Sequence, residues 1–179
     1  WFKREFCEEG TNYDIMTAEA DKIPVGCDRL LYLPYLMGER TPHLDPNARG
    51  SFVGLSAMHT RGDMIRAVME GVCYSQADSL GVLREMGADV SDMRVCGGGG
   101  KSPLWRGMLA DVYGVPCARV KSDEGPSLGA AILAMVGAGI YESVPAACDA
   151  VVGRKRAHPV GQGNAQLTDG KLLQGECEN

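Results

Sequence analysis

The sequence predicts an α/β fold, because two strand–turn–helix units follow one another in the second half of the chain. A short apolar strand at 93–96 leads through a run of glycines into a helix at 103–113. A second strand at 116–120 leads into a helix at 127–136. A helix that joins two neighbouring strands of one sheet makes them parallel with a right-handed crossover. The length of 179 residues allows one domain with a sizeable core.

The first half of the chain adds two short strands that flank a long polar loop. A helix is predicted at 13–23, and an apolar strand follows at 30–36. Pro34 cannot donate to a ladder, so it should lie at the end or on the edge of that strand. The segment 38–50 is rich in Pro, Asp, Asn and Gly and predicts a loop, and a strand follows at 51–55.

The longest predicted helix runs over 61–86. Its apolar residues recur at three- and four-residue steps: Ile65, Val68, Met69, Val72, Leu80 and Leu83. Thr60 and Asp63 have the spacing of a capping box, which predicts the start of the helix. Gly71 and Gly81 weaken the helix interior, so we expect another part of the chain to approach closely there.

The pattern ends soon after a short helix predicted at 143–152. Beyond Gly153 the apolar residues are too sparse to pack: Leu167, Leu172 and Leu173. We therefore divide the chain into a domain at 1–153 and a tail at 154–179 that we expect to be disordered.

Composition excludes several classes of function. With 18 basic and 23 acidic residues, the chain has no electrostatic footprint for nucleic acid or for an anionic membrane. No apolar run reaches the roughly 18 residues of a membrane helix. Seven cysteines stand singly with no C-x-x-C pair, which predicts neither disulfides nor zinc and favours a reducing, cytoplasmic setting. The histidines have no metal-ligand spacing either: His43, His59 and His158.

The most informative local motif is the glycine run at 97–100 between a predicted strand and a predicted helix. Ser102 before Pro103 is typical of a helix start. Backbone without side chains lets a base, ribose or phosphate lie against it, and the free N–H groups of the helix polarise an acceptor. A plain glycine-rich turn is an equally weighted alternative. A Walker loop is excluded, because it would need a glycine where Val95 stands.

Other motifs have a structural interpretation. The glycine turn at 123–131 also opens a helix, and its small residues favour close packing over ligand contact. Asp63 and Glu70 lie in a helix, where a carboxylate is more often a cap or a solvated charge than a base.

Two stretches carry a resemblance to a known family. Residues 50–55, GSFVGL, and 63–70, DMIRAVME, resemble the second signature of the FGGY carbohydrate kinases at every defined position. The preceding segments 33–42 and 45–50 are similar to the xylulokinase branch and less so to the glycerol kinases. The two glycine turns are similar to the family's adenosine-side loops. The resemblance covers residues 1 to about 152.

The resemblance implies an actin- and hexokinase-like ATPase fold built of two RNase H-like domains. In that family ATP and Mg²⁺ lie in the cleft between the domains, and the first domain holds most of the sugar. This chain would be most of the second domain, incomplete at its N-terminus. Residues implied to line adenine and ribose are Gly97, Gly98, Gly99, Gly100 and Ser102.

The resemblance also implies what this chain lacks. The family's catalytic aspartate and its phosphate-gripping hairpin would lie upstream of Trp1, so no residue here is named catalytic and none as a metal ligand. Phosphoryl transfer depends on positioning and charge neutralisation, so we expect no activity from this chain alone.

Three functions remain open at this point. The first is the ATP-side part of a ketose kinase, with xylulose favoured, whose sugar is bound through the missing domain. The second is an adenine-nucleotide-binding or interaction module without catalysis. The third is a domain that only folds or forms a homodimer.

Overall fold

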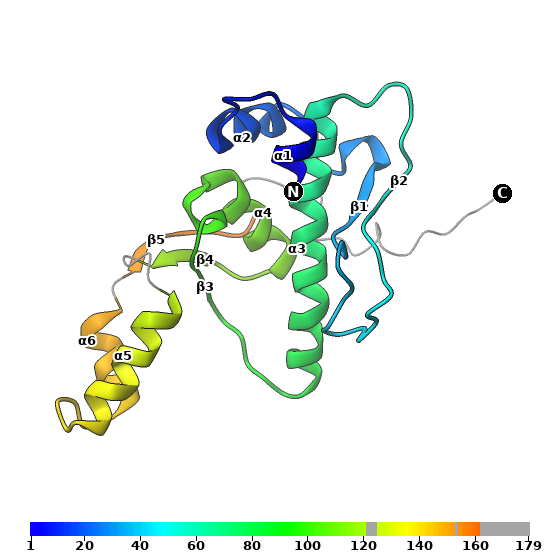
Figure 1. Ribbon diagram of the computed structural model, residues 1–179. Coiled ribbons are helices and arrows are strands. Elements are labelled where there is room, and N and C mark those ends of the chain that lie inside the picture. The colour runs from blue at the N-terminus through cyan, green and yellow to red at the C-terminus, as the bar shows by residue number, and fades with distance from the viewer. Residues whose placement is uncertain (121–124, 153, 162–179) are drawn as a thin grey trace.

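The computed structural model describes residues 1–120, 125–152 and 154–161, and a long central helix organises it (Figure 1). This helix, α3 (Arg61–Glu85), has two short helices at its N-terminal end, α1 (Phe2–Phe6) and α2 (Tyr13–Asp21). The capping box predicted for Thr60 and Asp63 is present at its start. The sequence had no signal for α1, whose five residues are too few to show a period.

One side of α3 carries a two-stranded antiparallel sheet formed by β1 (Leu31–Leu33) and β2 (Ser51–Val53). Both strands are shorter than predicted, and β1 ends immediately before Pro34. Gly71 is the contact point, because a Cβ there would lie 2.1 Å from the Tyr32 carbonyl oxygen. The close approach predicted at Gly71 is confirmed. At Gly81 a Cβ would meet nothing within 4 Å, so the same expectation is wrong there.

The other side of α3 carries the predicted strand–helix–strand unit. The strands β3 (Met93–Val95) and β4 (Cys117–Val120) are parallel, and α4 (Pro103–Tyr113) connects them. A single turn of 3₁₀ helix, η2 (Gly99–Lys101), lies between β3 and α4. Parallel pairing places the carboxyl ends of β3 and β4 at the same edge of the sheet, with Val95 opposite Arg119.

A third strand corrects the expectation for the tail. β5 (Arg154–His158) pairs antiparallel with β4, so this part of 154–179 is not disordered. The segment has no alternating apolar pattern, and its backbone hydrogen bonds to the β4 edge form the strand instead. Residues 162–179 lie outside the described part of the chain.

Two helices form a hairpin that projects away from α3 (Figure 1). They are α5 (Gly125–Gly137) and α6 (Val144–Val151), which lie side by side. The Ser143 hydroxyl accepts a hydrogen bond from the Ala146 N–H at 3.3 Å, which confirms Ser143 as the cap of α6.

The main core lies where α3 packs on α4 and on the N-terminal helices. Its larger buried residues are Phe2, Met16, Ile65, Met69, Leu80, Met108, Leu109 and Tyr113. In the described residues, no helix has both the length and the apolar character needed to cross a membrane.

Candidate functional site

The candidate site is the glycine turn at the carboxyl end of β3. Gly97 has φ +75°, in the left-handed region that favours glycine, and it turns the chain away from the strand. Gly97 and Gly98 are both exposed, and a Cβ on either would meet nothing within 4 Å. These two residues therefore present bare backbone to an open space, as a flat ligand requires.

The second half of the turn is packed against the protein. A Cβ on Gly99 would lie 3.3 Å from the Trp105 ring, and one on Gly100 would lie 2.9 Å from the Val95 carbonyl oxygen. Gly100 is buried. The five predicted residues thus lie in one turn with two parts. Gly97 and Gly98 are exposed, whereas Gly99 and Gly100 pack against α4 and β3.

Ser102 begins α4. Its hydroxyl oxygen accepts a hydrogen bond from the Trp105 N–H at 3.2 Å, and Pro103 occupies the first helical position. The helix start predicted from this Ser-Pro pair is confirmed. The positive end of the helix dipole of α4 therefore lies beside the glycine turn, where it favours an acceptor or an anion.

Arg106 adds a positive charge to the same place. Its Nη1 donates to the Gly100 carbonyl oxygen at 2.6 Å. Burial and the nearby Arg119 lower the pKa of the Arg106 guanidinium, although it remains charged at neutral pH. Sequence reasoning missed Arg106, since nothing in its spacing shows that its side chain folds back toward the turn.

This geometry fits an adenine nucleotide better than it fits a metal ion. The open backbone of Gly97 and Gly98 could contact a base or ribose, and the N-terminus of α4 beside it favours a hydrogen-bond acceptor. Among the described residues there is no group of three or more His, Cys, Asp or Glu side chains that could hold a metal ion.

Glu70, which the sequence assigned to a cap or a solvated charge, is buried instead. Its carboxylate forms an ion pair with Arg66, with Oε1 2.7 Å from Nε. The N–H of Gly26 donates to the same carboxylate at 3.2 and 3.3 Å. The interpretation is wrong for Glu70 and right for Asp63, because a helix position alone does not show which distant backbone will cover it. Both residues stabilise the fold and neither contacts the glycine turn.

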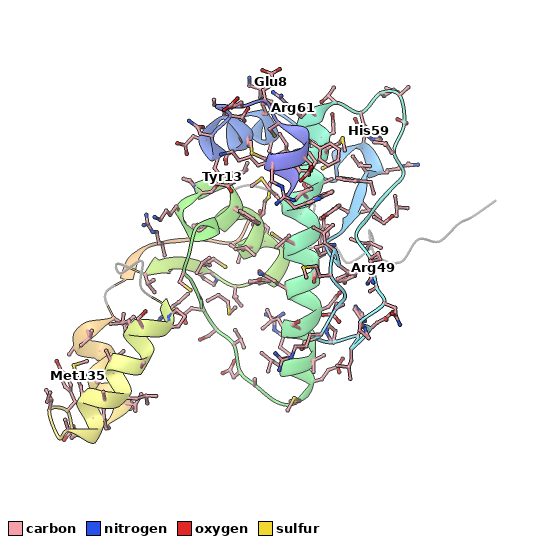
Figure 2. The ribbon with its side chains drawn as sticks, viewed as in Figure 1. Glu8, Tyr13, Arg49, His59, Arg61 and Met135 are labelled. Atoms are coloured by element: carbon pink, nitrogen blue, oxygen red, sulfur yellow. The ribbon has the colours of Figure 1, made fainter. Side chains whose placement is uncertain are left out.

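Other charged side chains tie surface segments together. Arg61 lies at the start of α3 (Figure 2). Its Nη2 forms an ion pair with Oε1 of Glu19 in α2 at 2.6 Å. Arg49 lies beside the two-stranded sheet (Figure 2), and its Nη1 donates to the carbonyl oxygens of Pro46 and Ala48. These contacts are structural.

Comparison with known proteins identifies the family. Residues 2–138 match the model described as "FGGY family of carbohydrate kinases, C-terminal domain". This chain belongs to the FGGY family of carbohydrate kinases. The xylulose kinase of Staphylococcus epidermidis is 41% identical over 152 residues, which cover 85% of this chain and 30% of that protein. The gluconokinase of Bacillus subtilis is 37% identical over 149 residues, 83% of this chain and 29% of the relative.

Solved structures agree with the family. The ligand-bound xylulose kinase of Lactobacillus acidophilus superimposes with a TM-score of 0.85 at 29% identity, covering 96% of this chain and 35% of that one. The Plasmodium falciparum glycerol kinase with ADP, at 20% identity and a TM-score of 0.71, shows the shared fold. The predicted α/β, actin- and hexokinase-like ATPase fold is confirmed as a partial domain. This FGGY chain spans about a third of the length of the relatives it matches.

Proposed function

We propose that this chain is the ATP-binding part of a sugar kinase that transfers the γ-phosphate of ATP to a ketose. The observation that carries the proposal is the bare backbone of Gly97 and Gly98 at the carboxyl end of β3, beside the N-terminus of α4. Ligands of α/β folds gather at such strand ends. Gly97, Gly98, Gly99, Gly100 and Ser102 are proposed to form the adenine and ribose side of the site.

Xylulose is the favoured sugar. Two relatives named xylulose kinases, from Staphylococcus epidermidis and Bacillus subtilis, are 41% and 40% identical to this chain. Two relatives named gluconokinases are 37% and 36% identical, so gluconate is the sugar to compare. The sugar itself would be bound by sequence outside this chain.

We propose that this chain binds the nucleotide and that other sequence binds the sugar and supplies the catalytic base. This chain alone should therefore not phosphorylate a sugar. Phosphoryl transfer needs a positioned acceptor, a base and charge neutralisation around the γ-phosphate. Mg²⁺ is usually held by substrate phosphates, water and one or two carboxylates, so the phosphates of ATP would supply part of its coordination. When bound, Mg²⁺ would neutralise charge on the transferred phosphate. The role of this chain's own residues is to bind and orient adenosine.

Calorimetry tests the proposal with the 179-residue chain. We expect heat on titration with ADP or adenosine, and none with Gly98→Val, whose side chain would begin in open space, since a Cβ at Gly98 meets nothing within 4 Å. A coupled assay with ATP, Mg²⁺ and xylulose or gluconate should show no turnover. Absence of nucleotide binding would contradict the proposal that this chain binds ATP. Sugar phosphorylation by this chain would contradict the proposal that it is inactive alone.

The alternative, a non-catalytic module that forms a homodimer, is supported by the hairpin of α5 and α6. Leu133 and Ile140 are 63% and 65% exposed on it. Met135 lies in the same hairpin, away from α3 (Figure 2). Sedimentation of the chain with and without Leu133→Glu distinguishes the two hypotheses. A dimer that this substitution dissociates favours the non-catalytic dimerising module. A monomer favours the ATP-binding part of a sugar kinase.

A further inference from the structure

Three side chains of α4 and its cap hold the glycine turn in place. Ser102 accepts from the Trp105 N–H, the Trp105 ring lies against Gly99, and Arg106 binds the Gly100 carbonyl oxygen. The Ser102 contact lies within the start of the helix, and the Trp105 contact is apolar. Only the third reaches from α4 to the turn with a charged donor, and its N···O distance of 2.6 Å is shorter than the 3.2 Å of the Ser102 cap.

The peptide group between Gly100 and Lys101 is held at both ends. Arg106 binds its carbonyl oxygen, and a hydrogen bond within the turn holds its N–H. The Gly100 carbonyl points to Arg106, and the N–H of the same peptide, that of Lys101, donates to the Gly98 carbonyl oxygen at 3.0 Å. A peptide group is planar, so holding both ends sets the direction of the whole unit. Glycine has the widest choice of backbone conformations, so a run of four needs such restraint to keep one shape.

The contacts of Arg106 in the described part of the chain centre on the Gly100 carbonyl oxygen. Within the described part of the chain, no carboxylate lies within ion-pair distance of Arg106, and its Nε is buried with no hydrogen-bond partner. Arg106 is half-buried, and leaving its buried Nε–H without an acceptor is costly. The hydrogen bond to the Gly100 carbonyl oxygen is therefore the role of this side chain that the geometry supports.

We propose that Arg106 is a positioning residue for the nucleotide: by holding the Gly100 carbonyl it keeps Gly97 and Gly98 open for adenosine. The inference rests on the proposed nucleotide-binding function. Arg106 acts through the backbone and does not touch the ligand. Loss of the contact lets the turn sample other shapes, and binding then has to select one of them, which lowers affinity.

The test compares Arg106→Met and Arg106→Lys with Arg94→Met in the 179-residue chain. Arg94 is an exposed arginine on β3 and serves as the matched control. ¹H–¹⁵N spectra without ligand report the amides of Gly97–Lys101, and calorimetry reports adenosine and ADP affinity. A well-dispersed spectrum establishes that each variant is folded, and Arg106→Lys keeps a charged donor if Arg106→Met does not fold.

We expect Arg106→Met to shift the amides of Gly99, Gly100 and Lys101 and to weaken adenosine and ADP by the same factor, about tenfold. Arg106→Lys should recover part of that loss, and Arg94→Met should change neither reading. Unchanged turn amides, or unchanged adenosine affinity in the folded variants, would overturn the inference. A much larger loss for ADP than for adenosine would also overturn it, because Arg106 would then act on phosphate directly. Adenosine titration of the unsubstituted chain separates two failures. If that chain binds no adenosine, the proposed nucleotide-binding function is wrong; if it binds adenosine and Arg106→Met binds equally well, only the role of Arg106 is wrong.

Discussion

Arg66 and Glu70 form a buried ion pair one turn apart on α3, with both side chains 3% exposed. Arg66 also donates to the Ile23 carbonyl oxygen at 2.9 Å, and Glu70 accepts from the Gly26 N–H. The pair therefore joins the segment after α2 to α3. A buried charge left without its partner is strongly destabilising, which makes this pair a sensitive point of the fold.

Replacing Glu70 should destabilise the chain. Glu70→Ala leaves the Arg66 guanidinium buried and the Gly26 N–H without an acceptor, so we expect the free energy of unfolding in urea to fall by about 3 kcal/mol. Glu85→Ala, at the exposed end of the same helix, is the control and should change it by less than about 0.5 kcal/mol. Equal effects of the two substitutions would contradict a buried ion pair.

Gly71 and Gly81 should respond in opposite directions to alanine. At Gly71 the new Cβ would lie 2.1 Å from the Tyr32 carbonyl oxygen, so β1 or α3 must shift, and we expect a loss of about 2 kcal/mol or more. At Gly81 the space is open, and alanine should stabilise the helix by about 0.5–1 kcal/mol. Thermal and urea unfolding measure both. Destabilisation at Gly81 as large as at Gly71 would show that helix α3 does not lie on β1 as described.

The elements that the sequence predicted well are those whose signals are local. The start of α3 follows from Thr60 and Asp63, and α4 follows from Ser102 with apolar spacing along a single helix. The environment of Glu70 depends on backbone 44 residues away, which no local pattern records. β5 is formed by pairing with β4 and not by its own composition.

The candidate site was predicted only in part for the same reason. The glycine run and its place between a strand and a helix can be read from the sequence. Its division into an open pair, Gly97 and Gly98, and a seated pair, Gly99 and Gly100, depends on what Trp105 and Val95 contact.

The cap of α3 should make stability depend on acidity. Burial alone would raise the pKa of Asp63, but hydrogen bonds from the Thr60 hydroxyl and N–H, at 2.6 and 2.8 Å, outweigh it and lower this pKa below its usual 3.8. A group with a lowered folded-state pKa stabilises the protein above its unfolded pKa, and this contribution is lost as the pH falls through the folded value.

The measurement is urea unfolding of the chain and of Asp63→Ala at pH 7 and at successively lower pH below 4. The substitution should cost about 1 kcal/mol at pH 7, and the difference should shrink on acidification. A difference that is constant with pH would show that the carboxylate charge has no part in the cap.

The rate at which Cys96 is alkylated should show whether ADP binds at the glycine turn. Cys96 is exposed immediately before Gly97, whereas Cys27, Cys73 and Cys117 are buried. Burial raises the pKa of Cys73 to about 12 and that of Cys117 to about 11, so neither forms thiolate at pH 8. We expect rapid alkylation of Cys96, slowed by ADP, with the buried thiols unmodified in the folded chain. Mass spectrometry of peptides measures each site, and equal modification of Cys96 with and without ADP would place the nucleotide elsewhere.

An ADP titration followed by ¹H–¹⁵N spectra tests most directly whether the glycine turn after β3 binds an adenine nucleotide. We expect progressive, saturable shifts that are largest at the amides of Gly97, Gly98 and Gly99, and no such shifts in folded Gly98→Val. Shifts centred on another part of the chain, or no shifts at millimolar ADP, would contradict it.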